Sequence, residues 1–205
     1  MRLNLLNQEE LKRLYNEELV FDFPKSELKP LRAMYNLMDR GVYDPLLVTE
    51  NGEAVGYALV WLPSDRSGGL LEYFGVLRGK RNGGLGAQIL DLLAERYGQI
   101  FGEAEAPDSD DPEENDLRRR RINFYLRSGF RLLDYECALF GVHFHCLYRG
   151  PERDDRKIEQ MHRGVYAGYF SRSHMARHIQ LPLRPGETIN PAPAWVEEDE
   201  KEIFP

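Results

Sequence analysis

Cysteine is scarce in this sequence of 205 residues. Cys137 and Cys146 are the only two, too few for a disulfide framework and without the paired spacing of a zinc site. Neither the start of the chain nor any later segment has an apolar run of the length that a signal peptide or a membrane span requires. We therefore expect a cytoplasmic protein with reduced cysteines and no membrane partner.

Basic residues are not in excess either, since 27 Lys and Arg face 34 Asp and Glu. A nucleic-acid binder uses a broad positive surface to displace phosphate counterions, and this composition does not provide one. The four arginines Arg118 to Arg121 follow an acidic run from Asp108 to Asp116, which is typical of a solvated helix beside a solvated loop. The charge balance favours a small or cationic partner and no nucleic acid.

Hydrophobic spacing predicts both helices and strands, and hence an α/β chain. Asn51-Gly52 between two apolar runs is the strongest hairpin signal. The helical stretches are 7–23, 26–41, 87–97, 117–127 and 158–170, and the strands are 46–49, 54–61, 69–76, 100–106, 130–138 and 142–148. A strand, a glycine-rich turn and a helix therefore follow one another around residue 80.

The composition changes beyond Pro151. The apolar stripe from Ile158 to Phe170 is typical of core or dimer packing, and the Pro- and Glu-rich remainder is expected to be extended or partly disordered. We therefore expect residues 151–205 to form a C-terminal helical extension and tail, through which a homodimer could assemble.

The glycine-rich turn is Arg81-Asn82-Gly83-Gly84-Leu85-Gly86-Ala87. A helix N-terminus offers unpaired backbone N–H groups and a positive dipole end to a pyrophosphate, and glycine lets phosphate oxygens approach. The mononucleotide P-loop pattern is absent, and an antiparallel hairpin precedes this turn, unlike a dinucleotide-binding fold. Phosphate binding and a plain tight turn both remain open on this motif alone.

Two motifs together resemble one known family. The segment from Leu71 to Gly86, LEYFGVLRGKRNGGLG, resembles the acetyl-CoA-binding motif of the GNAT N-acetyltransferase superfamily. Asn123 to Phe130, NFYLRSGF, is similar to the second signature of that superfamily, in the right order along the chain. The resemblance implies a domain over residues 1–150 with a mixed, mostly antiparallel sheet of about six or seven strands and flanking helices. Arg78 stands where the family commonly has Pro, and Asn82 interrupts its usual Arg-Gly-basic sequence.

The resemblance also implies roles for individual residues. Val76 and Leu77 would lie beside pantetheine, with the Val76 N–H polarising the thioester carbonyl. The phosphates would rest on the turn, formed by Arg81, Asn82, Gly83, Gly84, Leu85, Gly86 and Ala87. Glu72 would be the general base, placed on the face of Val76 by the strand period of two, and Tyr125 the acid that protonates the leaving thiolate. Asn123 would hydrogen-bond the cofactor or backbone.

Each of these residues also has a purely structural interpretation. Glu72 could face solvent or an arginine, Tyr125 could be a core aromatic, and Asn123 could lie on the helix surface. Arg78 or Lys80 could meet the 3'-phosphate or simply be exposed.

Other polar groups carry weaker functional signals. Glu103 and Glu105 could recognise a cationic amine or lie at an exposed strand end. His143 and His145 share a strand face without an evident third metal ligand, so we expect no metal.

The leading hypothesis is an N-acetyltransferase that moves an acetyl group from acetyl-CoA to a primary amine, of a small molecule, by direct attack in a ternary complex. Acetylation of protein N-termini or lysines is a second enzymatic reading that differs only in the acceptor. A non-catalytic acyl-CoA-binding regulatory or interaction module of the same fold is the alternative from another class.

Overall fold

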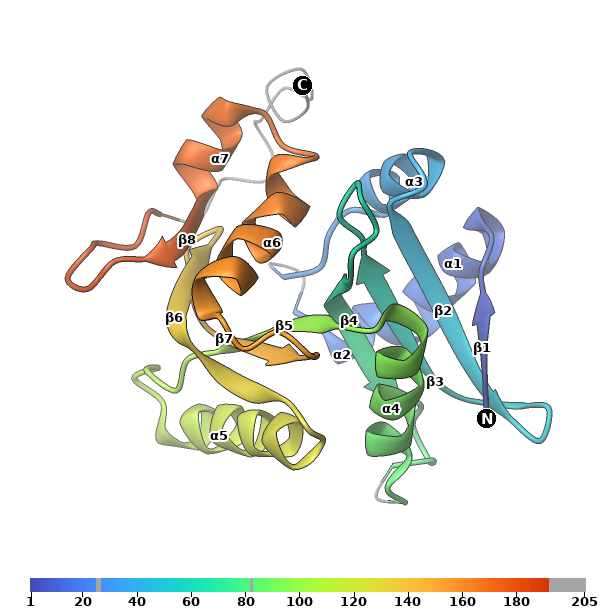
Figure 1. Ribbon diagram of the computed structural model, residues 1–205. Helices are drawn as coiled ribbons and strands as arrows, with labels where there is room; N and C mark the ends of the chain where they lie inside the picture. The colour runs from blue at the N-terminus through green and yellow to red at the C-terminus, as the bar shows by residue number, and fades with distance from the viewer. Residues whose placement is uncertain (25–26, 82, 192–205) are drawn as a thin grey trace. The chain divides into compact units, whose positions relative to one another are not determined.

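The computed structural model describes residues 1–24, 27–81 and 83–191 of the chain (Figure 1). It contains two compact units, Met1–Gly98 and Gln99–Pro205. The described residues contain eight strands in mostly antiparallel layers with flanking helices, so the predicted α/β fold class is confirmed and the strand number slightly exceeds the prediction. None of the described helices combines the length and apolar character that crossing a bilayer requires.

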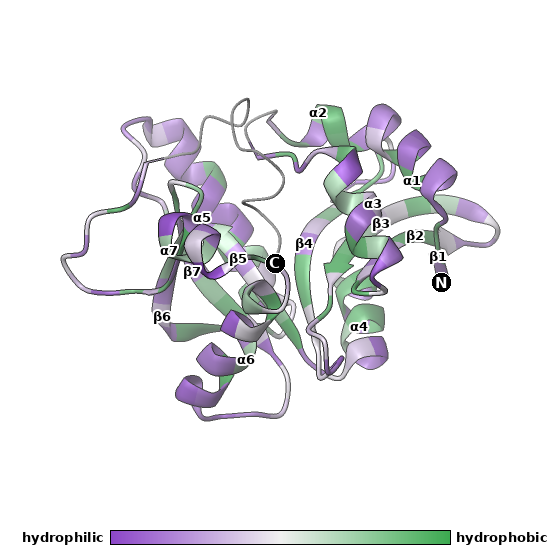
Figure 2. Ribbon diagram, turned by 90° about the horizontal axis from the view of Figure 1, so that it is seen from above, coloured by the Kyte–Doolittle hydropathy of each residue, from purple (hydrophilic) through white to green (hydrophobic). Residues whose placement is uncertain are grey.

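The first unit is a four-stranded antiparallel layer covered by helices. Its strands pair in the order β1-β2-β3-β4. Figure 2 shows α1, α2 and α3 on one face of this layer and α4 on the other. The elements are β1 (Arg2–Leu5), α1 (Gln8–Leu14), the π-helical turn η1 (Tyr15–Leu19), α2 (Val20–Asp22), α3 (Leu31–Asp39), β2 (Tyr43–Glu50), β3 (Glu53–Trp61), β4 (Gly69–Val76) and α4 (Leu85–Tyr97).

Local signals in the sequence explain several boundaries in this unit. Asn7 and Glu10 form the predicted capping box at the start of α1. Asn51 and Gly52 have φ angles of 51° and 85°, the left-handed conformation that a tight hairpin turn needs between β2 and β3. The helix expected from residue 26 begins only at Leu31, because Pro30 takes the N-cap position; Ser26 itself lies outside the described residues.

The second unit has its own antiparallel layer, in the order β5-β7-β6-β8. Helix α5 packs against β5 and β6, and α6 packs against β6, β8 and α7. The elements are β5 (Ile100–Glu105), α5 (Pro112–Arg127), β6 (Arg131–Leu139), β7 (Val142–Arg149), α6 (Asp155–Ala167), α7 (Arg172–His178) and β8 (Ile179–Leu183).

Two expectations for this unit were wrong. The acidic run is not loop throughout, because Asp111 caps α5 and Pro112 and the following acidic residues form its first turn, where they complement the helix dipole. The segment after the predicted last helix is not simply extended or disordered, since it forms α7 and then β8, which pairs with β6. Residues 192–205 of the predicted tail lie outside the described residues.

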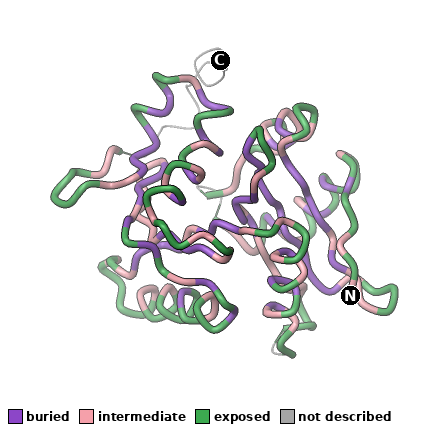
Figure 3. The backbone as a smooth tube through the Cα atoms, viewed as in Figure 1, coloured by how far each residue is buried: buried purple, intermediate pink, exposed green. Residues whose placement is uncertain are grey.

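Most of the buried residues lie on the strands of the two layers (Figure 3). Tyr57 and Trp61 on β3 are fully or almost fully buried in the first unit, as are Phe101 and Tyr148 in the second. Between β3 and β4 the packing is close enough to require glycine. A Cβ atom on Gly56 would lie 2.7 Å from the carbonyl oxygen of Gly75 and 2.7 Å from Cδ1 of Ile89.

Replacing Gly56 by alanine should therefore destabilise the protein by roughly 1–3 kcal/mol, because the backbone of β4 cannot move away without breaking its pairing. Gly164→Ala on α6 is the matched control, since a Cβ there meets no atom within 4 Å and alanine favours a helix by up to about 1 kcal/mol. Urea unfolding of both variants measures the difference. Equal stability of the two variants would contradict this account of the β3–β4 contact.

Candidate active site

The predicted site residues divide between the two units. Glu72 and the turn belong to residues 1–98, whereas Asn123 and Tyr125 belong to residues 99–205. The geometry of each group is therefore given within its own unit.

The glycine-rich turn ends β4 and opens α4 as expected. Gly84 is the N-cap residue with a φ of 75°, which favours glycine, and no side chain of the described residues caps the helix. A Cβ on Gly83 or Gly84 would meet no described atom within 4 Å. Leu85 begins the helix, and Gly86 in its first turn is buried. The backbone before α4 is thus exposed and carries no side chain at Gly83 and Gly84, so an anion could approach the first N–H groups of the helix. Asn82 lies outside the described residues.

The backbone N–H groups of Val76 and Leu77 point to opposite sides of the strand. The Leu77 N–H donates to the carbonyl oxygen of Val55 at 3.0 Å, toward β3. Since successive N–H groups of an extended chain point to opposite sides, the Val76 N–H points away from β3. The Val76 amide therefore lies on the edge of β4 that β3 does not pair with.

Arg81 fixes the turn from within. Its Nε donates to the Val76 carbonyl oxygen at 3.0 Å, and its guanidinium forms an ion pair with Asp22 at 2.8 Å. Asp22 also accepts a hydrogen bond of 2.7 Å from the Tyr57 hydroxyl. Arg81 thus connects the end of β4 to α2, so its first role in this structure is to hold the turn in shape.

The two other basic side chains of the turn also have partners. The Arg78 guanidinium lies 4.8 Å from the ring centroid of Phe21, and the side chain is exposed. Lys80 pairs with Glu53 at 2.7 Å on the surface. An exposed pair of this kind contributes little to stability, so neither residue is held away from an incoming ligand.

Glu72 lies at an irregularity of β4. Leu59 pairs with Tyr73 and Val60 with Leu71, so Glu72 is an extra residue without a partner on β3, as in a β-bulge. The alternation of faces is interrupted there, and the period-two argument does not place Glu72 on the face of Val76. Its position follows from its contacts instead.

The Glu72 carboxylate has two partners within the first unit. Lys29 Nζ lies 2.6 Å from Oε1, and the Tyr43 hydroxyl donates to Oε2 at 2.5 Å. The Glu72 side chain is only 16% exposed, so the interpretation as a solvent-facing glutamate is wrong, and its ion-pair partner is a lysine rather than an arginine. Burial, followed by the charge of Glu72, raises the pKa of Tyr43 well above its usual value, which keeps the phenol as the donor.

In the second unit, Tyr125 is half-buried near the end of α5. Its ring packs edge-on against Phe124 and Phe130, with centroids 5.5 Å and 5.3 Å away. Burial raises the pKa of Tyr125 to about 12 against a smaller opposing effect of Arg121, so the phenol holds its proton at neutral pH. The hydroxyl has no hydrogen-bond partner among the described residues, which suits a donor as well as a packing residue. Asn123 is exposed on the same helix.

Glu103 and Glu105 on β5 are not at an exposed strand end. Glu103 accepts a hydrogen bond of 2.6 Å from the Tyr166 hydroxyl and lies 2.8 Å from His162 Nε2. Glu105 is buried and pairs with Arg118 at 3.0 Å and Arg121 at 2.6 Å. Side chains of the same unit already neutralise both carboxylates, which argues against direct recognition of a cationic amine by them.

His143 and His145 share a partner on the neighbouring strand. Glu136 lies 2.9 Å from a ring nitrogen of each, and Asp108 lies 2.7 Å from Nδ1 of His143. Burial alone would lower the pKa of His143, but Asp108 and Glu136 outweigh it, so the pKa is raised. These histidines form a cross-strand charge cluster.

Three partners of the acidic residues were not identified from the sequence, two in the first unit and one in the second. Lys29 stands in the connection before α3 and has no motif around it, and Tyr43 precedes the predicted start of its strand. His162 had a signal, because it falls four residues after Ile158 on the apolar stripe of α6, where a buried polar residue needs a partner.

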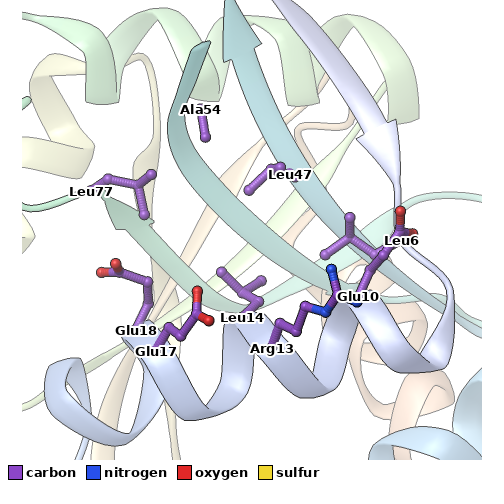
Figure 4. A pocket seen from close by; sticks show the side chains of 9 residues that line it. All are labelled: Leu6, Glu10, Arg13, Leu14, Glu17, Glu18, Leu47, Ala54 and Leu77. Carbon is purple, nitrogen blue, oxygen red and sulfur yellow. The ribbon is translucent and has the colours of Figure 1, made fainter.

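A pocket of 280 Å³ lies on the α1 side of the first unit (Figure 4). Its floor is apolar, and its rim carries charged side chains from α1 and η1. Of the predicted site residues, this pocket includes Leu77 but neither Glu72 nor any residue of the turn. The lining residues are Leu6, Glu10, Arg13, Leu14, Glu17, Glu18, Leu47, Ala54 and Leu77.

A family model described as the acetyltransferase (GNAT) family matches residues 9–130, more than half of the chain. No curated protein matches the sequence.

Solved structures share the fold at low sequence identity. A protein of Bacteroides thetaiotaomicron described as an acetyltransferase from the GNAT family is 22% identical, with a TM-score of 0.66 over 81% of this chain and 96% of that one. An aminoglycoside 6'-N-acetyltransferase in complex with coenzyme A is 13% identical, with a TM-score of 0.51 over 75% and 100%. Spermidine N-acetyltransferase from Vibrio cholerae is 9% identical, with a TM-score of 0.52 over 72% and 91%. At these identities the likeness establishes the fold.

The His162–Glu103 contact predicts a pH-dependent stability. Burial would lower the pKa of His162, but hydrogen bonds to Cys146 and Glu103 outweigh it and raise the pKa to about 9 from 6.5. A raised folded-state pKa means that this stabilisation is complete below about pH 6.5 and is lost as the pH rises through about 9, on the order of 3 kcal/mol in all. Urea unfolding from pH 6 to pH 9.5 should show the decline.

His162→Gln is the control for that measurement, because it keeps a polar side chain but cannot titrate. The stability difference between the parent protein and this variant should shrink toward high pH. A constant difference across the range would mean that folding does not raise the pKa of His162.

Proposed function

Because this chain belongs to the GNAT family of acetyltransferases, we propose that it transfers an acetyl group from acetyl-CoA to the primary amine of a small molecule in the cytoplasm. Membership of the family makes the chain an acetyltransferase. The donor, the acceptor class and the residue roles are the proposal, and the observations below support them.

The geometry of β4, the turn and α4 is the observation that supports acetyl-CoA as the donor. Gly84 leaves the start of α4 without a side-chain cap from the described residues, and the neighbouring glycine backbone is exposed. The diphosphate of the cofactor would accept hydrogen bonds from this turn, formed by Arg81, Asn82, Gly83, Gly84, Leu85, Gly86 and Ala87. Pantetheine would lie along Val76 and Leu77, on the edge of β4 toward which the Val76 N–H points.

The chemistry needs a proton acceptor and a proton donor. Glu72 would take the proton from the ammonium, directly or through water, and the free amine would attack the thioester carbon. The Val76 N–H would stabilise the oxyanion that forms. As the carbon–sulfur bond breaks, the Tyr125 phenol would protonate the thiolate, and the nitrogen would pass its second proton to the resulting phenolate, yielding the amide, CoA and the neutral Tyr125. Asn123 would contact the cofactor from the exposed side of α5.

The structure of the C-terminal segment limits which of its residues could form a homodimer interface. Residues 1–150 would carry the transferase, with residues 151–205 as its extension. The apolar stripe of α6 is buried within its own unit, with Ile158, Val165 and Tyr166 inaccessible, and β8 pairs with β6. A homodimer through the extension stays a prediction and would have to use other residues.

Acetyl-CoA and CoA should raise the unfolding temperature of the purified protein, whereas ATP and NAD should not. A ligand at about a hundred times its dissociation constant adds roughly 2.7 kcal/mol when it binds only the native state.

A panel of polyamines, amino sugars and lysine-containing peptides then identifies the acceptor by release of CoA. Turnover of peptides alone would reassign the acceptor to protein, and binding without any turnover would favour the non-catalytic module.

Tyr125→Phe should lower kcat by roughly 10- to 100-fold with little change in the dissociation constant of acetyl-CoA, because it removes the proton donor and keeps the ring that packs on Phe130. Phe124→Tyr is a matched variant of the neighbouring ring and should keep most activity. Steady-state kinetics with the acceptor found above measure both. Full activity of Tyr125→Phe would reassign Tyr125 to packing.

A further inference from the structure

The connection between α2 and α3 is fastened to β4 at two adjacent residues. The Tyr73 hydroxyl accepts a hydrogen bond of 2.8 Å from the Lys29 N–H and donates one of 2.9 Å to the Glu27 carbonyl oxygen. Phe23 packs edge-on against the Tyr73 ring, with centroids 4.9 Å apart. The Tyr73 hydroxyl therefore ties the backbone of residues 27–29 to β4 independently of the Lys29 side chain, and the Pro24 carbonyl oxygen accepts two further bonds from the Glu27 and Leu28 N–H groups.

The Lys29 side chain is directed to a different partner. Its Nζ lies 2.6 Å from Glu72 Oε1, and both side chains are mostly buried, at 15% and 16% exposure. The ammonium also lies 3.9 Å from the ring centroid of Trp61 and 5.8 Å from that of Tyr43. An ammonium against the face of a buried indole is held by the ring quadrupole as well as by the carboxylate.

Both oxygens of Glu72 are thus fixed in direction. Lys29 holds Oε1 and the Tyr43 hydroxyl holds Oε2, while the bulge removes Glu72 from the regular alternation of β4. A charge that is mostly buried needs such partners, because its desolvation is costly. Each carboxylate oxygen still has lone-pair capacity for one more donor.

Resting on the proposed role of Glu72 as proton acceptor, we infer that Lys29 is a positioning residue of the acetyl transfer. It holds the Glu72 carboxylate in one orientation, with its remaining lone pairs available to the incoming amine. The anchoring of residues 27–29 by Tyr73 supplies the fixed base from which the lysine reaches Glu72. Lys29 acts through Glu72 and does not touch the acetyl group.

A double-mutant cycle tests this inference in the full-length protein, with acetyl-CoA and an amine that it acetylates. Lys29→Met should lower kcat by about 10- to 100-fold, as expected when a catalytic group is misoriented, and leave the KM for acetyl-CoA within about twofold. In the Glu72→Gln background the same substitution should have little further effect on kcat, because the group that it positions is gone. Lys29→Arg should recover part of the lost rate.

Tyr73→Phe is the matched control, since it removes the two hydrogen bonds that tie the backbone of residues 27–29 to β4 without removing a partner of Glu72. Its loss of kcat should be much smaller than that of Lys29→Met. Equal losses would show that Lys29 acts by holding the segment, and the inference would then be wrong. An undiminished effect of Lys29→Met in the Glu72→Gln background would overturn it as well.

Two further results separate this inference from the proposed function and from misfolding. Full activity of Glu72→Gln would remove the base role and the inference with it, whereas a slow Glu72→Gln with a fully active Lys29→Met would reject the inference alone. Thermal unfolding checks that each variant is folded. If Lys29→Met does not fold, Tyr43→Phe replaces it in the cycle, because it frees Oε2 and keeps the ring; additive losses with Glu72→Gln would reject orientation of Glu72 by its partners.

Discussion

The antiparallel pairing of β4 with β3 is the constraint on which the first unit depends. It brings Gly56 so close to the backbone of β4 that a side chain there would collide with Gly75 and Ile89. It also uses the Leu77 N–H, which leaves the Val76 N–H pointing to the other edge of the strand. The same pairing contains the irregularity that makes Glu72 an extra residue. The positions of the turn, of the Val76 amide and of Glu72 therefore all follow from one strand pair.

In both units, mostly buried glutamates are paired with basic side chains. Glu72 pairs with Lys29, Glu103 with His162, and Glu105 with Arg118. An unpaired charge in these places would cost several kcal/mol, so each acid is matched by a base from another element. These carboxylates differ in what they can do chemically. Glu72 is a candidate base because its oxygens retain lone pairs, whereas Glu105 is paired with two arginines.

Much of the fold could be predicted from local signals. The capping box at Asn7, the Asn51-Gly52 hairpin and the range 69–76 of β4 appear in the structure as expected. Predictions failed where tertiary pairing or a cap decides the outcome. Strand β8 forms because β6 offers an edge for it, and the first turn of α5 forms because Asp111 caps it. The period-two argument does not apply at Glu72, because a bulge depends on the partner strand as well as on the strand itself.

The sequence by itself determined the order of strand, glycine turn and helix, and with two motifs it indicated the family, because backbone conformation and helix ends depend on residues close in the chain. Only the tertiary structure decided which side chains face the candidate catalytic groups. Lys29 and Tyr43 are distant from Glu72 in sequence, and His162 is distant from Glu103, so no local pattern could pair them. A buried charge pairs with whichever opposite charge lies close to it in space, and these groups come close only after the strands and helices have packed.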